Sequence, residues 1–256
     1  MHNIEISLLE ENTYYSARRL MATAARVTQR NQSISCMDDL IALHNKPVSD
    51  SLIASLAGLP HPTLQKFGTI TIAIVGASRR FLAQITRHQN EVKYMSGSLQ
   101  YSDMTGAASF VVPYNLLHDS SLIDDYLREC HRSQRVYETL IRSGADHDSA
   151  GYLMPQGMRN TLLISATPYQ WKHMISQRTC RRNSDETRVI MLRVWSLLLQ
   201  LDPYVFGDIG PFCMTGECRE GKMACGSPLP CGATPDDILQ TDYPLLFEQY
   251  TVKQMK

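Results

Sequence analysis

Basic and polar side chains gather in two short stretches of this chain. The first, residues 84–102 (QITRHQNEVKYMSGSLQYS), sets Arg87 beside His88 and continues into a loop rich in serine and glycine. The second, residues 178–188, contains the four arginines Arg178, Arg181, Arg182 and Arg188. Guanidinium groups bind phosphates through charge-assisted, paired hydrogen bonds, so both stretches indicate a polyanionic ligand such as a nucleotide. A solvated helix end with a mobile loop, or a solvated basic surface, is the alternative for either stretch alone.

The second stretch predicts crowding of like charges. If it continues a helix, Arg178, Arg181 and Arg182 share one face, and a turn at residues 183–184 redirects the chain before Arg188. Like charges on one face repel, and either solvent or a bound anion relieves the repulsion.

Overall charge excludes a general attraction to polyanions. The chain has 25 basic and 25 acidic residues and a formal net charge of zero. Such a balance gives no global field toward a nucleic acid polymer or an anionic membrane, so we expect neither as a partner. Any anion binding must come from local clusters.

Length and composition predict one main domain with a distinct C-terminal part. The 256 residues suffice for one large domain, which we place at residues 1–205. Residues 206–256 are rich in Gly, Pro and Cys and read as an extended appendage packed on or between subunits. The N-terminus lacks a signal-peptide pattern and no window approaches eighteen apolar residues, so we expect a soluble, cytoplasmic protein.

Cysteine usage favours reduced thiols. The chain has seven cysteines, an odd number that argues against a secreted disulfide framework. Cys213, Cys218, Cys225 and Cys231 lie in the C-terminal part without any C-x-x-C pair. We therefore expect no metal, with a zinc or iron–sulfur site as the alternative.

Hydrophobic periodicity predicts alternating short strands and amphipathic helices. The expected strands are residues 4–9, 67–75, 110–113 and 158–166. The expected helices are residues 14–29, 36–43, 50–57, 79–86, 121–143, 169–180 and 184–201. These elements must position the two basic stretches, which fall after the second strand and between the last two helices.

Five short motifs occur in one order along the chain. They are AARVT (24–28), HPT (61–63), Gln84 with RH (87–88), SxxYS (98–102), and RTCxR with ExR (178–188). In this order they resemble the flavin-dependent thymidylate synthase family. The segment GPFCMTGECREGKMACG (210–226) is also similar to the tail of some bacterial members.

The resemblance implies a fold and an activity. The fold is α+β, with a central, mostly antiparallel sheet flanked by helices, assembled as a homotetramer with active sites at subunit interfaces. The activity is C5 methylation of a uracil nucleotide, dUMP to dTMP. FAD is the noncovalent cofactor, NADPH the reductant and methylenetetrahydrofolate the carbon donor. Phosphates of the nucleotide and of FAD both need cations, which accounts for two arginine clusters.

The resemblance also assigns roles by position. The FAD contacts are Thr28, His61, Thr63, Arg87, His88, Gln89, Arg178 and Arg181. The substrate contacts are Gln84, Ser98, Gln100, Tyr101 and Arg188, and among these Gln84, Ser98 and Arg188 stand at the catalytic centre. Because the family's proposed mechanism needs no enzymic nucleophile and Ser98 has no evident partner base, Ser98 is interpreted as a binding group.

Several positions depart from the family pattern. Gln89 replaces the second arginine of RHR, eight residues instead of seven precede Ser98, Gln100 replaces an arginine, and Arg181 replaces a common asparagine. Each lost charge-assisted phosphate contact costs about 1.5 to 3 kcal/mol. The residues that would compensate are Lys93, Arg159, Arg181 and Arg182. The departures leave three alternatives: another pyrimidine nucleotide (UMP or a cytidine nucleotide), another one-carbon group, or a nucleotide-binding protein without catalysis.

Overall fold

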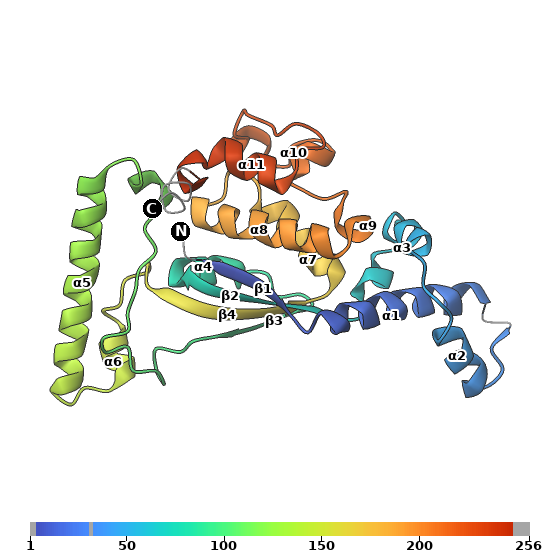
Figure 1. Ribbon diagram of the computed structural model, residues 1–256, viewed down its shortest axis with the longest axis horizontal. Helices are drawn as coiled ribbons and strands as arrows, with labels where there is room; N and C mark the ends of the chain where they lie inside the picture. The colour runs from blue at the N-terminus through green and yellow to red at the C-terminus, as the bar shows by residue number, and fades with distance from the viewer. Residues whose placement is uncertain (1–3, 31–32, 248–256) are drawn as a thin grey trace, which may run out of the picture.

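A four-stranded antiparallel sheet lies at the centre of the molecule, which a computed structural model describes for residues 4–30 and 33–247 (Figure 1). The strands are β1 (Glu5–Leu9), β2 (Ile70–Ser78), β3 (Val92–Ser96) and β4 (Arg159–Ala166), in the spatial order β1-β2-β4-β3. Each neighbouring pair is antiparallel. Helices flank the sheet, so the predicted α+β fold with an antiparallel sheet is confirmed.

The helices follow the amphipathic patterns of the sequence. They are α1 (Glu11–Arg30), α2 (Met37–His44), α3 (Asp50–Ala57), α4 (Arg79–Ile85), α5 (Ser120–Arg142), α6 (His147–Gly151), α7 (Pro168–Arg178), α8 (Asp185–Leu201), α9 (Pro203–Phe206), α10 (Phe212–Thr215) and α11 (Pro235–Asp242). The short 3-10 turns are η2 (Pro62–Lys66), η3 (Tyr114–Leu116) and η4 (Gly221–Met223). No helix in the described ranges is both long and apolar enough to cross a membrane.

Alternation along β2 divides the sheet into a covered and an open face. Ile70, Ile72 and Ile74 are buried on one face, whereas Val75 on the other is 44% exposed. Helices α4, α7 and α8 lie on the covered face (Figure 1). The isoleucines at these alternate positions bury their side chains against the helices, which fixes the register of the strands.

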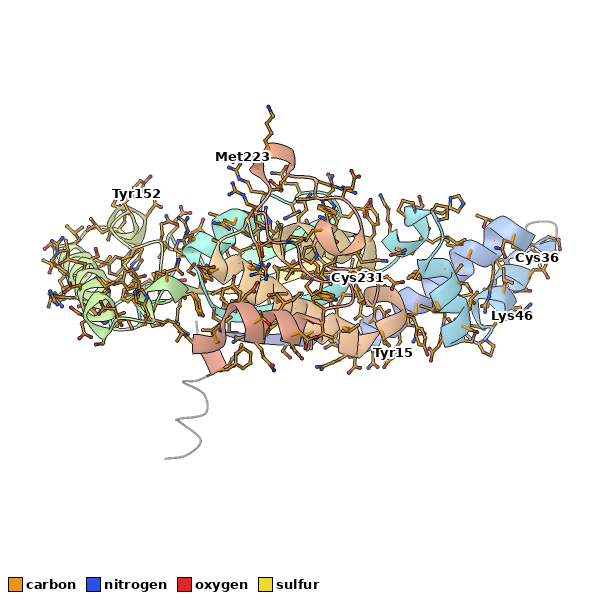
Figure 2. All side chains as sticks on the ribbon, turned by 90° about the horizontal axis from the view of Figure 1, so that it is seen from above. Tyr15, Cys36, Lys46, Tyr152, Met223 and Cys231 are labelled. Atoms are coloured by element: carbon orange, nitrogen blue, oxygen red, sulfur yellow. The ribbon has the colours of Figure 1, made fainter. Side chains whose placement is uncertain are left out.

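The molecule is elongated. Helices α1 to α3 extend to one end, where Cys36 and Lys46 lie, and α5 with α6 forms the other end, near Tyr152 (Figure 2). The turn around Met223 projects from the body between them (Figure 2).

The C-terminal part packs onto α8 through α11. Ile238, Leu239 and Tyr243 are buried and belong to the same hydrophobic cluster as Trp195 of α8. Apolar residues spaced along α11 give it this buried face. The domain boundary after residue 205 stays a prediction.

Three local expectations were wrong. The segment after His88 was expected to be loop, but Val92–Ser96 forms β3 because Val92, Tyr94 and Ser96 alternate inward at the sheet edge. The strand expected at 67–75 runs instead from Ile70 to Ser78. The strand expected at 110–113 is a single bridge between Phe110 and Met158.

Candidate functional site

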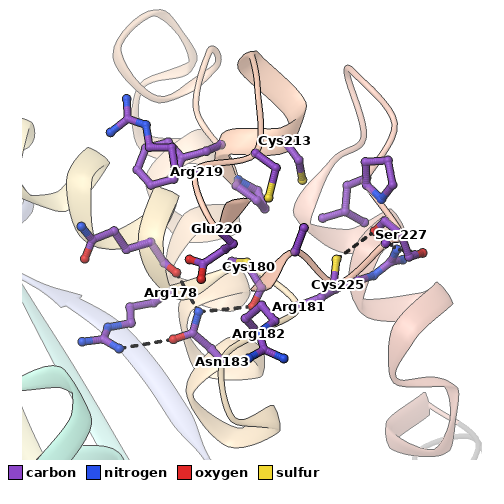
Figure 3. Close-up of a pocket in the computed structure, with 18 residues that line it drawn as sticks. Arg178, Cys180, Arg181, Arg182, Asn183, Cys213, Arg219, Glu220, Cys225 and Ser227 are labelled. Atoms are coloured by element: carbon purple, nitrogen blue, oxygen red, sulfur yellow. Dashed lines mark hydrogen bonds between the residues drawn. The ribbon is translucent and has the colours of Figure 1, made fainter. Parts of the chain in front are cut away.

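Arg178 joins the two basic stretches at the end of α7. Its Nε donates to His88 Nε2 at 2.8 Å, and its Nη2 donates to the Gln84 carbonyl oxygen at 3.0 Å. Its Nη1 donates to Asn183 Oδ1 at 3.3 Å (Figure 3). The structure therefore brings together Gln84, His88 and Arg178, three of the residues that the sequence assigned to the site.

The contact with Arg178 fixes the state of His88. A guanidinium only donates hydrogen bonds, so His88 Nε2 accepts and the neutral ring carries its proton on Nδ1. Burial lowers the pKa of His88 to about 4, with further lowering by the charge of Arg178 and by His173. His88 is 6% exposed and therefore stays uncharged at neutral pH.

Within the described residues, Arg178 forms no ion pair with a carboxylate. Its three acceptors are an imidazole nitrogen, a backbone carbonyl and a side-chain amide, all uncharged. Burial lowers the pKa of Arg178, the nearby Tyr94 raises it and Arg87 lowers it. A half-buried cation with only neutral partners is a good partner for a phosphate.

Two hydroxyl groups orient the side chain of Gln84. Its Oε1 accepts hydrogen bonds from Thr187 Oγ1 at 2.7 Å and from Ser184 Oγ at 2.9 Å. With both donors on Oε1, the amide NH₂ of Gln84 is left to donate to a ligand. The first turn of α8 thus positions a residue of α4.

Strand β3 separates the two halves of the first basic stretch. Arg87, His88 and Gln89 precede it, whereas Ser98, Gln100 and Tyr101 follow it. A five-residue strand spans about 16 Å. Ser98 Oγ accepts from the Gln100 backbone at 3.2 Å, and Tyr101 is 81% exposed. Within one chain, Ser98, Gln100 and Tyr101 therefore do not lie around His88.

The other expected FAD contacts also lie apart from Arg178. Thr28 is exposed near the end of α1, and His61 and Thr63 are exposed at η2. Thr28 Oγ1 donates to the Ala25 carbonyl oxygen at 2.8 Å. Within the described ranges no hydrogen bond connects these three residues to the Gln84–His88–Arg178 group.

Arg178, Arg181 and Arg182 do not share a helix face. Helix α7 ends at Arg178, and Asn183 Nδ2 donates to the carbonyl oxygens of Gln177 and Cys180 at 2.7 and 3.2 Å. The residues after Arg178 therefore form a turn and do not continue α7. The expectation of one crowded face was wrong because the helix stops three residues before Arg181.

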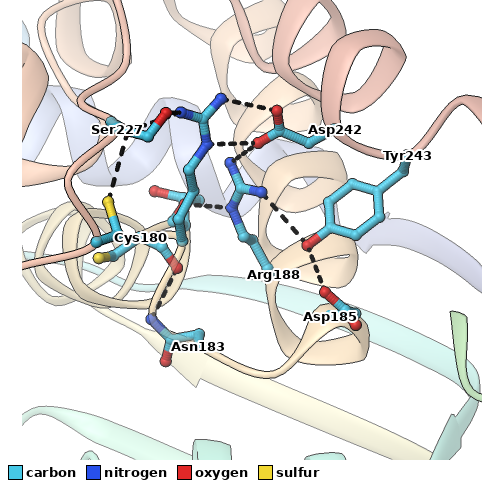
Figure 4. A network of polar contacts seen from close by, with 10 residues as sticks. Cys180, Asn183, Asp185, Arg188, Ser227, Asp242 and Tyr243 are labelled. Carbon is cyan, nitrogen blue, oxygen red and sulfur yellow. Dashed lines mark hydrogen bonds and ion pairs between the residues drawn. The ribbon is translucent and has the colours of Figure 1, made fainter. Parts of the chain in front are cut away.

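Arg181 and Arg188 instead meet at one carboxylate from α11 (Figure 4). Arg181 donates to both Asp242 oxygens at 2.8 and 3.0 Å, and Arg188 Nη2 lies 2.5 Å from Asp242 Oδ2. Arg188 Nε also donates to the Thr179 carbonyl oxygen at 2.8 Å. Burial alone would raise the pKa of Asp242, but the hydrogen bonds from both arginines hold it below its usual range.

The tyrosine after Asp242 completes this network. Arg188 Nη1 donates to the Tyr243 hydroxyl at 3.4 Å, and that hydroxyl donates to Asp185 at 3.2 Å. Arg188 is only 3% exposed. The residue expected to contact the substrate therefore faces the chain's own C-terminal helix, and its role toward a nucleotide stays a prediction.

Sequence reasoning missed the residues that hold the arginines and Gln84. Asp242 and Tyr243 carry no local signal, because they act through contacts with residues about sixty positions earlier. Ser184 and Thr187 had a signal, since a serine at a helix N-cap followed by threonine one turn later places two hydroxyls together. No group of three or more His, Cys, Asp or Glu in the described part of the chain is arranged to hold a metal ion.

Comparison with known families shows to which protein family the chain belongs. A family model described as thymidylate synthase complementing protein matches residues 8–204, which is most of the chain. The chain belongs to this family. The match includes the Gln84–His88–Arg178 group and Arg188, and it ends before α10 and α11.

Two curated relatives of this chain carry the same name. The chain is 24% identical to the flavin-dependent thymidylate synthase of Geobacter sulfurreducens over 177 residues, covering 69% of this chain and 76% of the relative. It is 26% identical to that of Pyrococcus horikoshii over 171 residues, covering 64% and 70%. These relatives confirm the resemblance found in the sequence, and with it an enzyme of the methyltransferase type.

A solved structure shares the fold. The UMP/dUMP methylase PolB from Streptomyces cacaoi, bound with 5-Br dUMP, superposes with a TM-score of 0.61. The similarity covers 80% of this chain and 93% of that one at 14% identity. This likeness supports the assigned fold.

The family implies a flavin, and the arrangement of this chain fits one. Arg178 offers a charge that no carboxylate of the described residues pairs with, and His88 beside it offers a neutral imidazole with Nδ1 protonated. A phosphate-bearing aromatic cofactor needs both a cation and uncharged donors.

Proposed function

We propose that this protein methylates C5 of a uracil nucleotide, converting dUMP to dTMP, with methylenetetrahydrofolate as carbon donor and NADPH as reductant. The observation that carries the proposal is the Gln84–His88–Arg178 group inside the matched family region. The bound FAD would supply hydride transfer.

The chain's own residues would bind and orient. Arg178, with the exposed Arg87 that directly precedes His88, would hold the cofactor's phosphates, and neutral His88 would donate from Nδ1. Gln84, fixed by Ser184 and Thr187, would donate its amide NH₂ to the nucleotide. Holding two reactants in one geometry removes much of the entropic barrier, and no side-chain nucleophile is required.

We expect the active enzyme to be a homotetramer, because one chain does not bring all the proposed site residues together. Ser98 and Tyr101 lie beyond β3 from His88, so a second copy would have to bring its own Ser98 to the site. The open sheet face exposes Leu9, Val75, Met95 and Leu163, whose exposed fractions run from 36% to 70%. Exposed apolar residues on one face favour association. Light scattering coupled to gel filtration should give four times the 28.9 kDa chain mass.

Cofactor binding and turnover test the proposal. The purified protein should take up FAD with the flavin's blue-light absorbance, and dUMP with the donor and NADPH should yield dTMP by mass spectrometry. A protein that stays colourless with excess FAD would contradict the flavoprotein assignment. Ligand-induced thermal stabilisation without turnover under any donor would favour the nucleotide-binding alternative.

A second substrate is favoured by one observation. Arg181, one of the residues expected to compensate for missing phosphate contacts, is occupied by Asp242 and Ser227, and exposed Gln100 replaces an expected arginine. The methylase from Streptomyces cacaoi is named for both UMP and dUMP. NADPH oxidation with dUMP, UMP and cytidine nucleotides compared in parallel separates the candidates. A clear preference for dUMP with dTMP as product removes the second one.

A further inference from the structure

Four of the seven cysteines line one cavity of about 660 Å³ (Figure 3). Cys180 lies in the turn between α7 and α8, and Cys213, Cys218 and Cys225 lie in the C-terminal segment, residues 211–229. All four are free thiols. Cysteine thiolates are the ligands by which proteins hold iron–sulfur clusters, and four of them complete the usual ligand set.

The fold changes which cysteines form the set. The sequence favoured no metal, because Cys213, Cys218, Cys225 and Cys231 include no C-x-x-C pair. Cys231 is not among the residues that line the cavity, and Cys180 from the opposite wall takes its place. Burial raises the pKa of the Cys180 thiol, and the nearby Cys213 and Cys225 raise it further, so these three thiols lie within electrostatic reach of one another. Tertiary packing therefore supplies the fourth thiol.

A single metal ion does not fit these thiols. No group of three or more His, Cys, Asp or Glu within the described ranges is arranged to hold one ion. An iron–sulfur cluster contains several metal ions, so its thiolate ligands stand further apart than the ligands of one ion do. A cavity in the size range of small-molecule sites admits four irons and four sulfides. The arrangement favours a cluster over one zinc ion.

The surroundings favour the negative charge of such a cluster. Arg182 and Arg219 line the cavity, and within the described residues neither forms an ion pair with a carboxylate. The lining includes one carboxylate, Glu220. The Arg219 guanidinium lies 3.9 Å from the centroid of the Phe212 ring, a cation–π contact that holds it at this wall. Four thiolates around a [4Fe–4S] core give a net negative charge, which nearby cations stabilise.

We infer that Cys180, Cys213, Cys218 and Cys225 bind a [4Fe–4S] cluster in this cavity. Each thiol loses its proton, and its sulfur binds one iron. The inference goes beyond the proposed function, because none of these cysteines belongs to the predicted flavin or nucleotide contacts. Two predicted flavin contacts, Arg178 and Arg181, also line the cavity. Iron and sulfide are therefore the quantities to measure, since FAD contains neither.

Cluster transfer to the full chain tests the inference. A synthetic [4Fe–4S] cluster with four simple thiolate ligands is mixed with the protein under anaerobic conditions. Four protein thiols displace the four small thiolates, which take up the released protons, and no electrons change hands. After gel filtration we expect about four irons and about four acid-labile sulfides per chain. Reduction with dithionite should give the electron paramagnetic resonance signal of a reduced cluster.

The decisive variant removes one cysteine from each wall. C180S/C218S should lose most of the bound iron, because the cluster then lacks two of its four ligands. The matched control C36S/C231S removes two exposed cysteines outside the cavity and should bind as much iron as the unmodified chain. Equal urea midpoints of the cluster-free proteins would show that the loss of iron does not come from unfolding.

Thiol labelling locates the cluster. Cys218, Cys225 and Cys231 are all exposed and should react with iodoacetamide in the cluster-free chain. In the loaded chain Cys218 and Cys225 should no longer react, whereas Cys231 should react as before. Peptide mass spectrometry separates the three sites.

The arginines allow a test that leaves every thiol in place. R182Q/R219Q should lower the reduction potential of the bound cluster, because two cations that stabilise its more negative, reduced form are gone. R128Q/R132Q removes two exposed arginines of α5 and should leave the potential unchanged.

Five results would overturn the inference. They are no cluster transfer, equal iron in C180S/C218S and the unmodified chain, loss of iron in C36S/C231S, protection of Cys231 together with the others, and an unchanged potential in R182Q/R219Q. Release of the iron when FAD is added would assign the cavity to the flavin and overturn it as well. Iron binding needs no turnover, so failure here is distinguishable from failure of the proposed reaction.

Discussion

Arg178 and Arg188 stand on either side of the α7–α8 turn, in opposite electrostatic surroundings. Arg178 donates to neutral acceptors only, on His88, Gln84 and Asn183. Arg188 lies against the carboxylate of Asp242 and is almost fully buried. We therefore expect two purposes within one arginine cluster: Arg178, paired with neutral acceptors, is available to a ligand, whereas Arg188, paired with Asp242, holds the C-terminal helix.

Removing Asp242 should break the ion pair that holds Arg188. D242A leaves the buried guanidinium of Arg188 without its counter-ion, so we expect the free energy of unfolding to fall by about 3 to 5 kcal/mol. Urea denaturation measures this. The control D125A removes a carboxylate from an exposed pair with Arg128 and should cost less than about 1 kcal/mol. Equal small losses in both variants would contradict a holding role for Asp242.

Acid should lower the stability of the protein by protonating His88, the neutral partner of Arg178. Its pKa in the folded protein is about 4, below the ordinary 6.5, so His88 binds its proton more readily after unfolding. Its contribution to stability is complete above pH 6.5 and is lost as the pH falls toward 4, by up to about 3 kcal/mol.

Urea midpoints at several pH values test this window. H88Q keeps an acceptor for Arg178 and should flatten the profile between pH 6.5 and 4. Burial also lowers the pKa of His173, so H173Q serves as the comparison and measures its share. An H88Q profile as steep as that of the unmodified chain would sink the assignment.

Neutralising Arg178 should affect ligand binding. R178Q removes the cation that has only neutral partners, so FAD affinity should fall about ten- to a hundredfold. Flavin absorbance during titration gives the Kd. R128Q, on exposed α5, should leave it unchanged, and a similar loss in both variants would point to nonspecific charge effects.

The smallest effect is expected at Thr187. T187V removes one hydroxyl that orients Gln84, at a cost of about 1 kcal/mol, which is roughly fivefold in the KM for dUMP. T187S should restore the value. T139V, at an exposed hydroxyl of α5, is the matched control. A changed kcat with unchanged KM would argue against positioning through Gln84.

Sequence reasoning located most elements but not the contacts between them. The helix expected at 50–57 coincides with α3, and the helix expected at 121–143 differs from α5 by one residue at each end. Apolar spacing is local, so it survives in the folded protein. Strand β3 was missed because its serine and glycine neighbours resemble a loop, and pairing with β4 stabilised it.

The candidate site was predicted in part. Gln84, His88 and Arg178 were named from the motifs and meet in the structure, although their roles toward FAD and the nucleotide stay predictions. Ser98, Gln100 and Tyr101 were named as substrate contacts, and within one chain β3 separates them from His88. Spacing along a chain gives no distance once a strand intervenes.

The sequence by itself determined the fold class, the family and the two basic stretches, because hydrophobic period, motif order and charge are properties of neighbouring residues. Only the tertiary structure decided which acceptor each arginine received. Arg181 and Asp242 are 61 positions apart, and Arg178 and His88 are 90 apart. Electrostatic pairing depends on distance and burial, and both are set when α7, α8 and α11 pack together.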